Sequence, residues 1–142
     1  MSKPRGIRNN NPLNIRRNGT KWEGLSPVQE DKSFFQFRTM AYGYRAAIKT
    51  IHTYFNKYGL KTIRRIIHRW APPCENDTET YIKVVAGRSG ISPDAEINIY
   101  DQQQMIAIVS AMSYMENGIE PDEEDVYMGY LMAFALWGKN TC

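Results

Sequence analysis

Twenty residues from Thr39 to Tyr58 constrain the fold most strongly. Their apolar side chains recur at steps of three and four residues, which is the period of one face of an α-helix. Gly59 follows at the position where glycine commonly ends a helix. The pattern predicts a long helix over 39–58, and the class of the whole fold depends on whether other segments share its period.

Four later segments share it. Pro72 and Pro73 end the first of them, and Asn76 followed by Glu79 is typical of a capping box that opens the second. The last segment has four acidic residues in its first turn, where the helix dipole favours anions. The expected helices span about 63–70, 76–87, 101–116 and 121–137.

The chain before these helices has a different character. Residues 5–19 are polar and contain a proline and a glycine, so we expect an ordered loop there. The short aromatic segments 20–25 and 33–38 are joined by a polar connection and predict a small β-hairpin. The expected fold is therefore mainly α with one small hairpin, in a single domain over 1–142.

The composition excludes several classes of protein. Cys74 and Cys142 are too few for a disulfide framework, and with His52 and His68 they show no zinc-binding spacing. We therefore expect two unpaired thiols, no metal and no cofactor. No run of eighteen apolar residues predicts a membrane span, and the N-terminus lacks the apolar stretch of a secretory signal.

Charge is divided unevenly along the chain. Residues 1–70 contain 15 Lys and Arg against 3 Asp and Glu, whereas residues 71–142 contain 3 against 12. Such a division suggests either a basic face for an anionic polymer or two halves that dock on each other. Composition does not separate these two alternatives.

Glu116 is the best-placed candidate for chemistry, because it ends an apolar predicted helix just before Asn117 and Gly118. The negative end of the helix dipole disfavours an ionised carboxylate there, and packing against aromatic residues would raise its pKa further. A glycosidase needs such a protonated acid to release the glycosidic oxygen. The alternative is an exposed glutamate at a helix end.

Three segments resemble known muralytic proteins. IVSAMSYMENG, ending in Glu116, resembles the catalytic helix of the lysozyme and lytic-transglycosylase superfamily. RGIRNNNPLNIRRNGTKWEGL with FFQFRTMAYGYRAAI is similar to a part of bacterial glucosaminidases that has an Asn-Pro/Leu-x-x-Ile segment, a Trp-x-Gly turn and an aromatic segment before a helix. With WAPPCENDTETYIKVVAGRSG, the likeness covers roughly residues 5–121 and extends to phage and prophage proteins of virion-structural or lysozyme-like type.

The resemblance implies a lysozyme-like α+β domain that acts on peptidoglycan. In that superfamily the Glu helix usually precedes the Asn-rich segment and the hairpin, whereas here it comes near the end. The chain is therefore either a circular permutation of such a core, which close termini would permit, or a partly coincidental match.

Further residues are candidates for the site, each with a structural alternative. Glu23 is the alternative acid and Asp31 a possible second carboxylate, while Glu75 beside Asn76 is expected to cap a helix. The asparagines would bind acetamido groups or shape a turn, and the tryptophan would stack on sugar or pack in the hairpin core. The expected substrate-binding residues are Asn11, Asn14, Arg16, Trp22 and Tyr114.

Two functions follow as hypotheses. The first is a phage-encoded muramidase or lytic transglycosylase, cytoplasmic or virion-associated, that cleaves the β-1,4 glycan of the cell wall with Glu116 as general acid. The second is a non-catalytic virion module or a nucleic-acid- or polymer-binding module that uses the basic first half. The aromatic residues fall mainly on core-periodic positions, which disfavours nucleic-acid binding.

Overall fold

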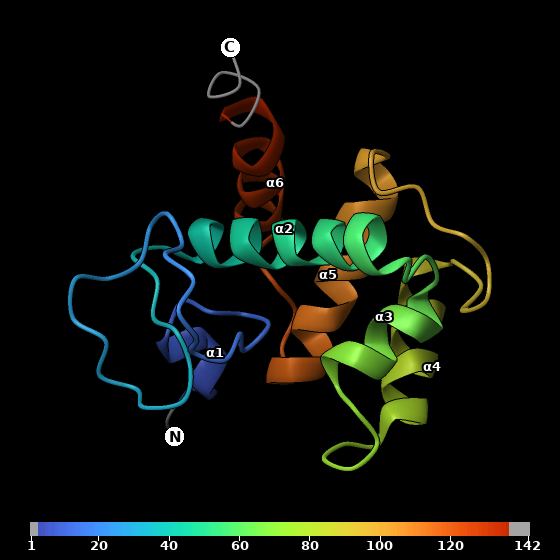
Figure 1. The fold of residues 1–142 in the computed structure, drawn as a ribbon, viewed down its shortest axis with the longest axis horizontal. Helices are drawn as coiled ribbons and strands as arrows, with labels where there is room; N and C mark the ends of the chain where they lie inside the picture. Colours follow the sequence, from blue (N-terminus) through green and yellow to red (C-terminus); the bar gives the residue numbers. More distant parts are fainter. Residues whose placement is uncertain (1–2, 137–142) are drawn as a thin grey trace.

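A computed structural model of the chain describes residues 3–136. Its elements are α1 (Arg5–Arg8), α2 (Met40–Tyr58), α3 (Ile63–Trp70), α4 (Thr78–Ser89), α5 (Gln102–Asn117), α6 (Glu123–Leu131) and the π-helical turn η1 (Met132–Leu136). Helix α2 runs across the molecule, with the loops of residues 9–38 at one end and the α3–α4 pair at the other, while α6 stands beside it (Figure 1).

The five long helices confirm the helical period of the sequence, and their ends follow from local chemistry. The residue before each helix accepts a hydrogen bond from a backbone N–H of the first turn, as N-caps do. Left-handed glycines end three of the helices, at Gly59, Gly90 and Gly118. The predicted end of the last helix at residue 137 lies outside the described residues.

Two predicted boundaries are wrong by a few residues. The cap of α4 is Asp77, whose carboxylate accepts from the Thr80 N–H at 3.2 Å, rather than Asn76. The same helix continues past Gly87 to Ser89, because Gly87 leaves the helix backbone uninterrupted and Gly90 is the residue with positive φ. Residues 5–8 form the short helix α1, where the sequence predicted loop.

The predicted β-hairpin is also wrong, and with it the α+β class. Within residues 3–136 no segment forms a strand, and the backbones of the two aromatic segments pair at one isolated bridge, between Leu25 and Phe37. Gly24 explains part of this result, because its φ of +83° turns the chain out of the extended conformation and brings the Tyr42 ring where a Cβ would stand. The described fold is helical.

Side-chain amides take the place of a strand ladder in these loops. Asn11 is fully buried, donates to the carbonyls of Ile15 and Phe35 and accepts from the Ile15 N–H. Asn10 donates to the carbonyls of Phe37 and Arg38. These bonds connect the start of the chain to residues 35–38 without a regular register.

The apolar side chains form two clusters. The main core comes from α2 to α6 and their connections, and includes Leu13 from the loops. A smaller cluster of Phe35, Phe37 and Ala46, with Trp22 against it, joins the loops to α2. None of the helices among the described residues is long and apolar enough to cross a membrane.

Some of the basic residues of the first half (1–70) form ion pairs with acidic residues of the second half (71–142). Arg64 lies within ion-pair distance of Glu79 and Asp94, and two weaker pairs join Arg16 to Glu75 and Lys61 to Glu96. The exposed pairs contribute little stability. Docking of the basic half on the acidic half therefore accounts for part of the charge pattern.

Candidate functional site

Glu116 lies near the end of α5, where two other parts of the chain meet it. The Asn14 side-chain amide donates to Oε1 at 2.8 Å, and the Tyr81 hydroxyl of α4 donates to Oε2 at 2.9 Å. Asn14 comes from the loop about a hundred residues earlier. Both carboxylate oxygens thus have a donor, and the side chain is partly buried rather than open to solvent.

Burial raises the pKa of Glu116 above its ordinary value, while the hydrogen bonds from Asn14 and Tyr81 oppose the rise. The pKa of Tyr81 lies well above its usual range, because the phenol is buried and because the Glu116 carboxylate faces it. Tyr81 therefore keeps its proton and remains a donor. Burial thus shifts the ionisation of Glu116 towards the neutral form, while Asn14 and Tyr81 donate hydrogen bonds that stabilise its ionised form.

The sequence around Glu116 allows this close packing. The Asn117 side chain donates to the Pro12 carbonyl at 2.8 Å, which fixes the loop against the end of α5. A Cβ on Gly6 would lie 2.5 Å from the Asn117 side-chain oxygen, so only glycine permits α1 to approach there. Asn14 itself has a φ of +53°, a conformation that asparagine tolerates better than most residues.

A cavity of about 740 Å³ opens beside Asn14, between the loops, α2 and α3. Its lining contains four aromatic rings together with amide, hydroxyl and charged groups: Asn14, Ile15, Arg16, Asn18, Thr20, Trp22, Thr50, Thr53, Tyr54, Tyr58, Arg69, Trp70, Pro72 and Glu75. Glu116 does not line this cavity directly. Asn14 is the residue that both lines the cavity and holds the Glu116 carboxylate.

The wall on the helical side is anchored next to Asn14. The Trp70 indole N–H donates to the carbonyl of Leu13 at 3.3 Å. The Tyr54 ring meets the Trp70 ring edge-on, with 5.9 Å between the ring centroids. Aromatic rings beside polar groups in one concave site are typical of a binding pocket for a small or chain-like ligand.

The structure places the expected substrate-binding residues in two groups. Asn14, Arg16 and Trp22 line the cavity, and Trp22 also packs against the smaller apolar cluster. Asn11 does not reach the cavity, because it is fully buried in backbone hydrogen bonds. Tyr114 lies on α5 beneath the Arg88 guanidinium, 3.6 Å from the ring centroid, and is not a lining residue.

The other carboxylates differ in their surroundings. Glu23, the alternative acid, forms an ion pair with the buried Arg45 at 3.0 Å and does not line the cavity. Glu75 does line it, at an exposed position 3.9 Å from Arg16. It is not the expected helix cap, because Asp77 caps α4.

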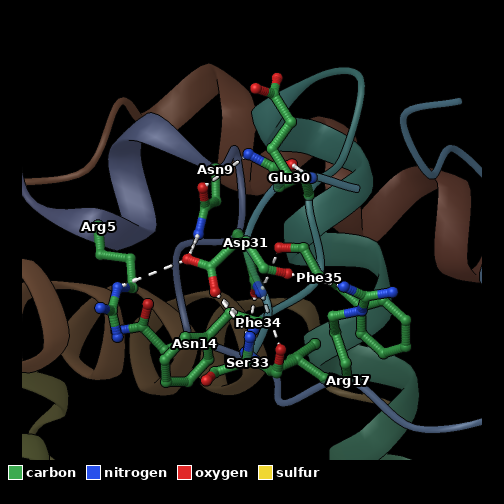
Figure 2. A network of polar contacts seen from close by, with 12 residues as sticks. Arg5, Asn9, Asn14, Arg17, Glu30, Asp31, Ser33, Phe34 and Phe35 are labelled. Atoms are coloured by element: carbon green, nitrogen blue, oxygen red, sulfur yellow. Dashed lines mark hydrogen bonds and ion pairs between the residues drawn. The ribbon is translucent and has the colours of Figure 1, made fainter. Parts of the chain in front are cut away.

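Asp31 is the centre of a network that holds the loops together (Figure 2). Its carboxylate accepts from the backbone N–H groups of Ser33 and Phe34 and from the Asn9 side chain, and Arg5 approaches it at 3.5 Å. These donors, chiefly Ser33 and Asn9, lower the pKa of Asp31 to about 2. A fully occupied carboxylate of this kind fits a structural role better than a second catalytic one.

Tyr81, Tyr54 and Trp70 are not among the residues that the sequence predicts for the site. Each occupies an apolar position of a helical pattern, so nothing in the local sequence separates them from core residues. The Pro72–Pro73 pair after Trp70 could have indicated a site residue. The two prolines end α3, so Trp70 lies at the end of that helix, next to a loop.

Comparison with known proteins gives one relative of high similarity. The chain is 46% identical over 120 residues to protein P5 of Pseudoalteromonas phage PM2, a match that covers 82% of this chain and 73% of P5. No family model matches the chain.

Proposed function

The chain belongs to the family of protein P5 of Pseudoalteromonas phage PM2, and we propose that it is a phage-encoded glycosidase that cleaves the β-1,4 glycan of peptidoglycan. Glu116 is the general acid in this proposal. The observation that carries it is the partly buried Glu116 carboxyl group, held by Asn14 and Tyr81 beside an aromatic-lined cavity.

The chemistry follows from the surroundings of Glu116. Burial raises its pKa and so increases the protonated fraction relative to an exposed glutamate. The protonated form transfers its proton to the glycosidic oxygen as the bond from that oxygen to the sugar carbon breaks. The carboxylate left behind accepts from Asn14 and Tyr81, so both donors stabilise the charge that develops on the enzyme. For this transfer the glycosidic oxygen has to come within hydrogen-bond distance of Glu116, next to Asn14, which lines the cavity whereas Glu116 does not.

The second half of the reaction depends on what attacks the sugar carbon. A water molecule activated by a carboxylate gives hydrolysis. Attack by the sugar's own hydroxymethyl group gives an anhydro product, and the proton of that hydroxyl returns to the Glu116 carboxylate. Glu75 is a carboxylate that lines the cavity. It is exposed and pairs weakly with Arg16, so we favour a mechanism with Glu116 as the single essential acid.

The phage relationship gives the proposal a biological setting. A muralytic enzyme of a phage acts on the wall either from the virion or from inside the infected cell. Either route supplies peptidoglycan as the substrate. The chain would need no metal and no organic cofactor for this reaction, since general acid catalysis by a carboxyl group requires neither.

The test is the release of soluble muropeptides from purified peptidoglycan. Glu116→Gln keeps the size of the side chain but removes the acidic proton, so cleavage should fall about 10²–10⁴-fold. Glu75→Gln should reduce cleavage less, and Glu23→Gln less again, because Glu23 lies in an ion pair outside the cavity. Glu123→Gln, at an exposed position of α6, is the matched control.

Thermal unfolding of each variant checks that the fold is retained. A Glu116→Gln protein that clears cell wall at the wild-type rate would remove Glu116 from the mechanism. A wild-type protein that releases nothing from several wall types would favour the alternative of a non-catalytic virion module, and a salt-dependent titration with DNA then tests polymer binding.

A further inference from the structure

One arginine of the cavity is held by aromatic rings rather than by a carboxylate. The Arg69 guanidinium lies 4.1 Å from the ring centroid of Tyr58 and 5.0 Å from that of Tyr54. The guanidinium of this exposed residue lies over both rings and also donates to the Tyr54 hydroxyl. Its remaining N–H groups are not taken up by an acid. Among the described residues no carboxylate lies within ion-pair distance of Arg69.

The other charged residues of the cavity are differently placed. Arg16 also lines the cavity and lies 3.9 Å from Glu75, so these two charges partly offset each other. Arg69 then leaves the lining with a net positive charge. A stacked guanidinium without an acid partner is suited to a planar anion such as a carboxylate, which it binds through two parallel hydrogen bonds.

Arg69 is connected to Glu116 only indirectly, through a series of contacts along the helical wall of the cavity. Trp70 is attached next to Asn14 through the Leu13 carbonyl, the Tyr54 ring follows Trp70, and Arg69 follows Tyr54. A saccharide that reaches Asn14 at one end would cross the aromatic rings before it meets Arg69. A contact at Arg69 therefore affects which chain binds, rather than proton transfer at Glu116.

We propose that Arg69, stacked on Tyr54 and Tyr58, forms a carboxylate-binding subsite that selects glycans carrying acidic substituents over neutral glycans. The proposal rests on the proposed function, whose substrate class it narrows. Peptidoglycan offers such carboxylates on the lactyl groups of its sugars and on its peptide stems. A chitin oligosaccharide has the same β-1,4 linkage and the same acetamido groups but no carboxylate, so it is the matched neutral ligand.

The experiment measures binding without cleavage. Calorimetric titrations of the Glu116→Gln protein use three ligands of equal glycan length: a muropeptide oligosaccharide, the same glycan stripped of its peptides, and a chitin oligosaccharide. We expect the acidic glycans to bind about tenfold more tightly than the neutral one. The preference should weaken as salt increases.

Variants on α3 locate the effect. Adding Arg69→Gln should remove most of the preference and leave affinity for the chitin oligosaccharide nearly unchanged. Arg69→Lys keeps the charge but not the planar, stacked geometry, so it should retain only part of the preference. Arg65→Gln, an exposed arginine of the same helix that does not line the cavity, should retain all of it.

The outcomes are distinct for the subsite and for the catalytic proposal. Equal affinity for acidic and neutral glycans would overturn the subsite, even if wild-type protein cleaves the wall. An equal loss in Arg65→Gln and Arg69→Gln would also overturn it, because general surface charge would then explain the preference. An Arg69-dependent preference in a protein whose wild type cleaves nothing would support the subsite and count against the catalytic proposal. A preference lost on removing peptides assigns the carboxylate to the stems.

Discussion

The loop region (residues 3–38) and the helical region (residues 40–136) solve the same folding problem in different ways. The helical region buries an apolar stripe from each helix in one core. The loop region has a small apolar cluster, and its backbone is satisfied by isolated backbone bonds together with bonds to the side chains of Asn10, Asn11 and Asp31. Packing dominates one region, and specific hydrogen bonds dominate the other.

The difference has a consequence for function, because the site forms where the two regions meet. Asn14 of the loop region and Tyr81 of the helical region donate to the two oxygens of Glu116. The cavity likewise has one wall from each region. Such a site depends on the position of the loops. Because few apolar contacts hold the loops, their hydrogen bonds are needed to keep the site in place, even where those bonds lie at partly exposed positions.

Replacing Asn11 by alanine should produce the largest effect on stability. The change leaves the Phe35 carbonyl and the Ile15 N–H without their buried partner and removes one of the two donors to the Ile15 carbonyl, which keeps the Phe35 N–H. Each unsatisfied buried group costs about 1–3 kcal/mol, so we expect a loss of about 3 kcal/mol or more in the free energy of unfolding. Chemical denaturation followed by circular dichroism measures it.

The matched control lies in the helical region. Asn98→Ala removes one hydrogen bond at an exposed position and should cost less than about 1 kcal/mol. Similar losses for the two variants would show that the loop region does not depend on its asparagines more than the helical region does.

The same contrast explains what the sequence predicts. The helix over 39–58 is found almost to the residue, as Met40–Tyr58, because its apolar period is a local property. The hairpin prediction fails, because the aromatic residues Phe35 and Phe37 can pack in one cluster whether their backbone pairs with a strand or with the side-chain amides of Asn10 and Asn11. Those bonds join residues more than twenty positions apart and leave no period.

For the candidate site too, residues with a local sequence signal could be predicted and residues defined by long-range contacts could not. Glu116 is conspicuous because the helix-ending Asn117-Gly118 pair follows it. Asn14, one of the expected substrate-binding residues, contacts Glu116 although about a hundred residues separate them in the sequence. Tyr81 has no such local signal, since a buried tyrosine on a helix has the same sequence context whether or not its hydroxyl meets an acid. The catalytic role of these residues stays a prediction.

Replacing Asp31 by asparagine should produce a smaller and pH-dependent loss. The folded-state pKa of Asp31 is lowered from an ordinary 3.8 to about 2, so its stabilising contribution is present above pH 4 and is lost as the pH falls through about 2. At pH 7 we expect Asp31→Asn to lose about 2 kcal/mol, because hydrogen bonds to a charged acceptor become neutral ones. Thermal unfolding from pH 7 to pH 2 measures the difference.

Near pH 2 the wild type and the Asp31→Asn variant should unfold at similar temperatures. A difference that stays constant across the pH range would mean that the charge of Asp31 contributes nothing and that only the shape of the side chain matters. The Asp77→Asn variant is the helical counterpart, since Asp77 also has a lowered pKa but caps an exposed helix end, and its loss at pH 7 should be smaller.

Tyr81→Phe should have the smallest effect on stability and tests how the two regions share Glu116. The phenyl ring fills the same buried space, while the hydrogen bond to Oε2 is lost. Because that bond lowers the pKa of Glu116, its removal should raise the pKa. If Glu116 is the general acid, the alkaline limb of the pH–activity profile should move upward with it. Carbon NMR of the Glu116 carboxyl group measures the same shift without any activity.

Asn14→Ala removes the donor from the loop region and should raise the pKa in the same direction, with a further loss in substrate affinity because Asn14 lines the cavity. A downward shift in Tyr81→Phe would show that Tyr81 does not stabilise the ionised carboxylate, and the two regions would then not act on Glu116 alike.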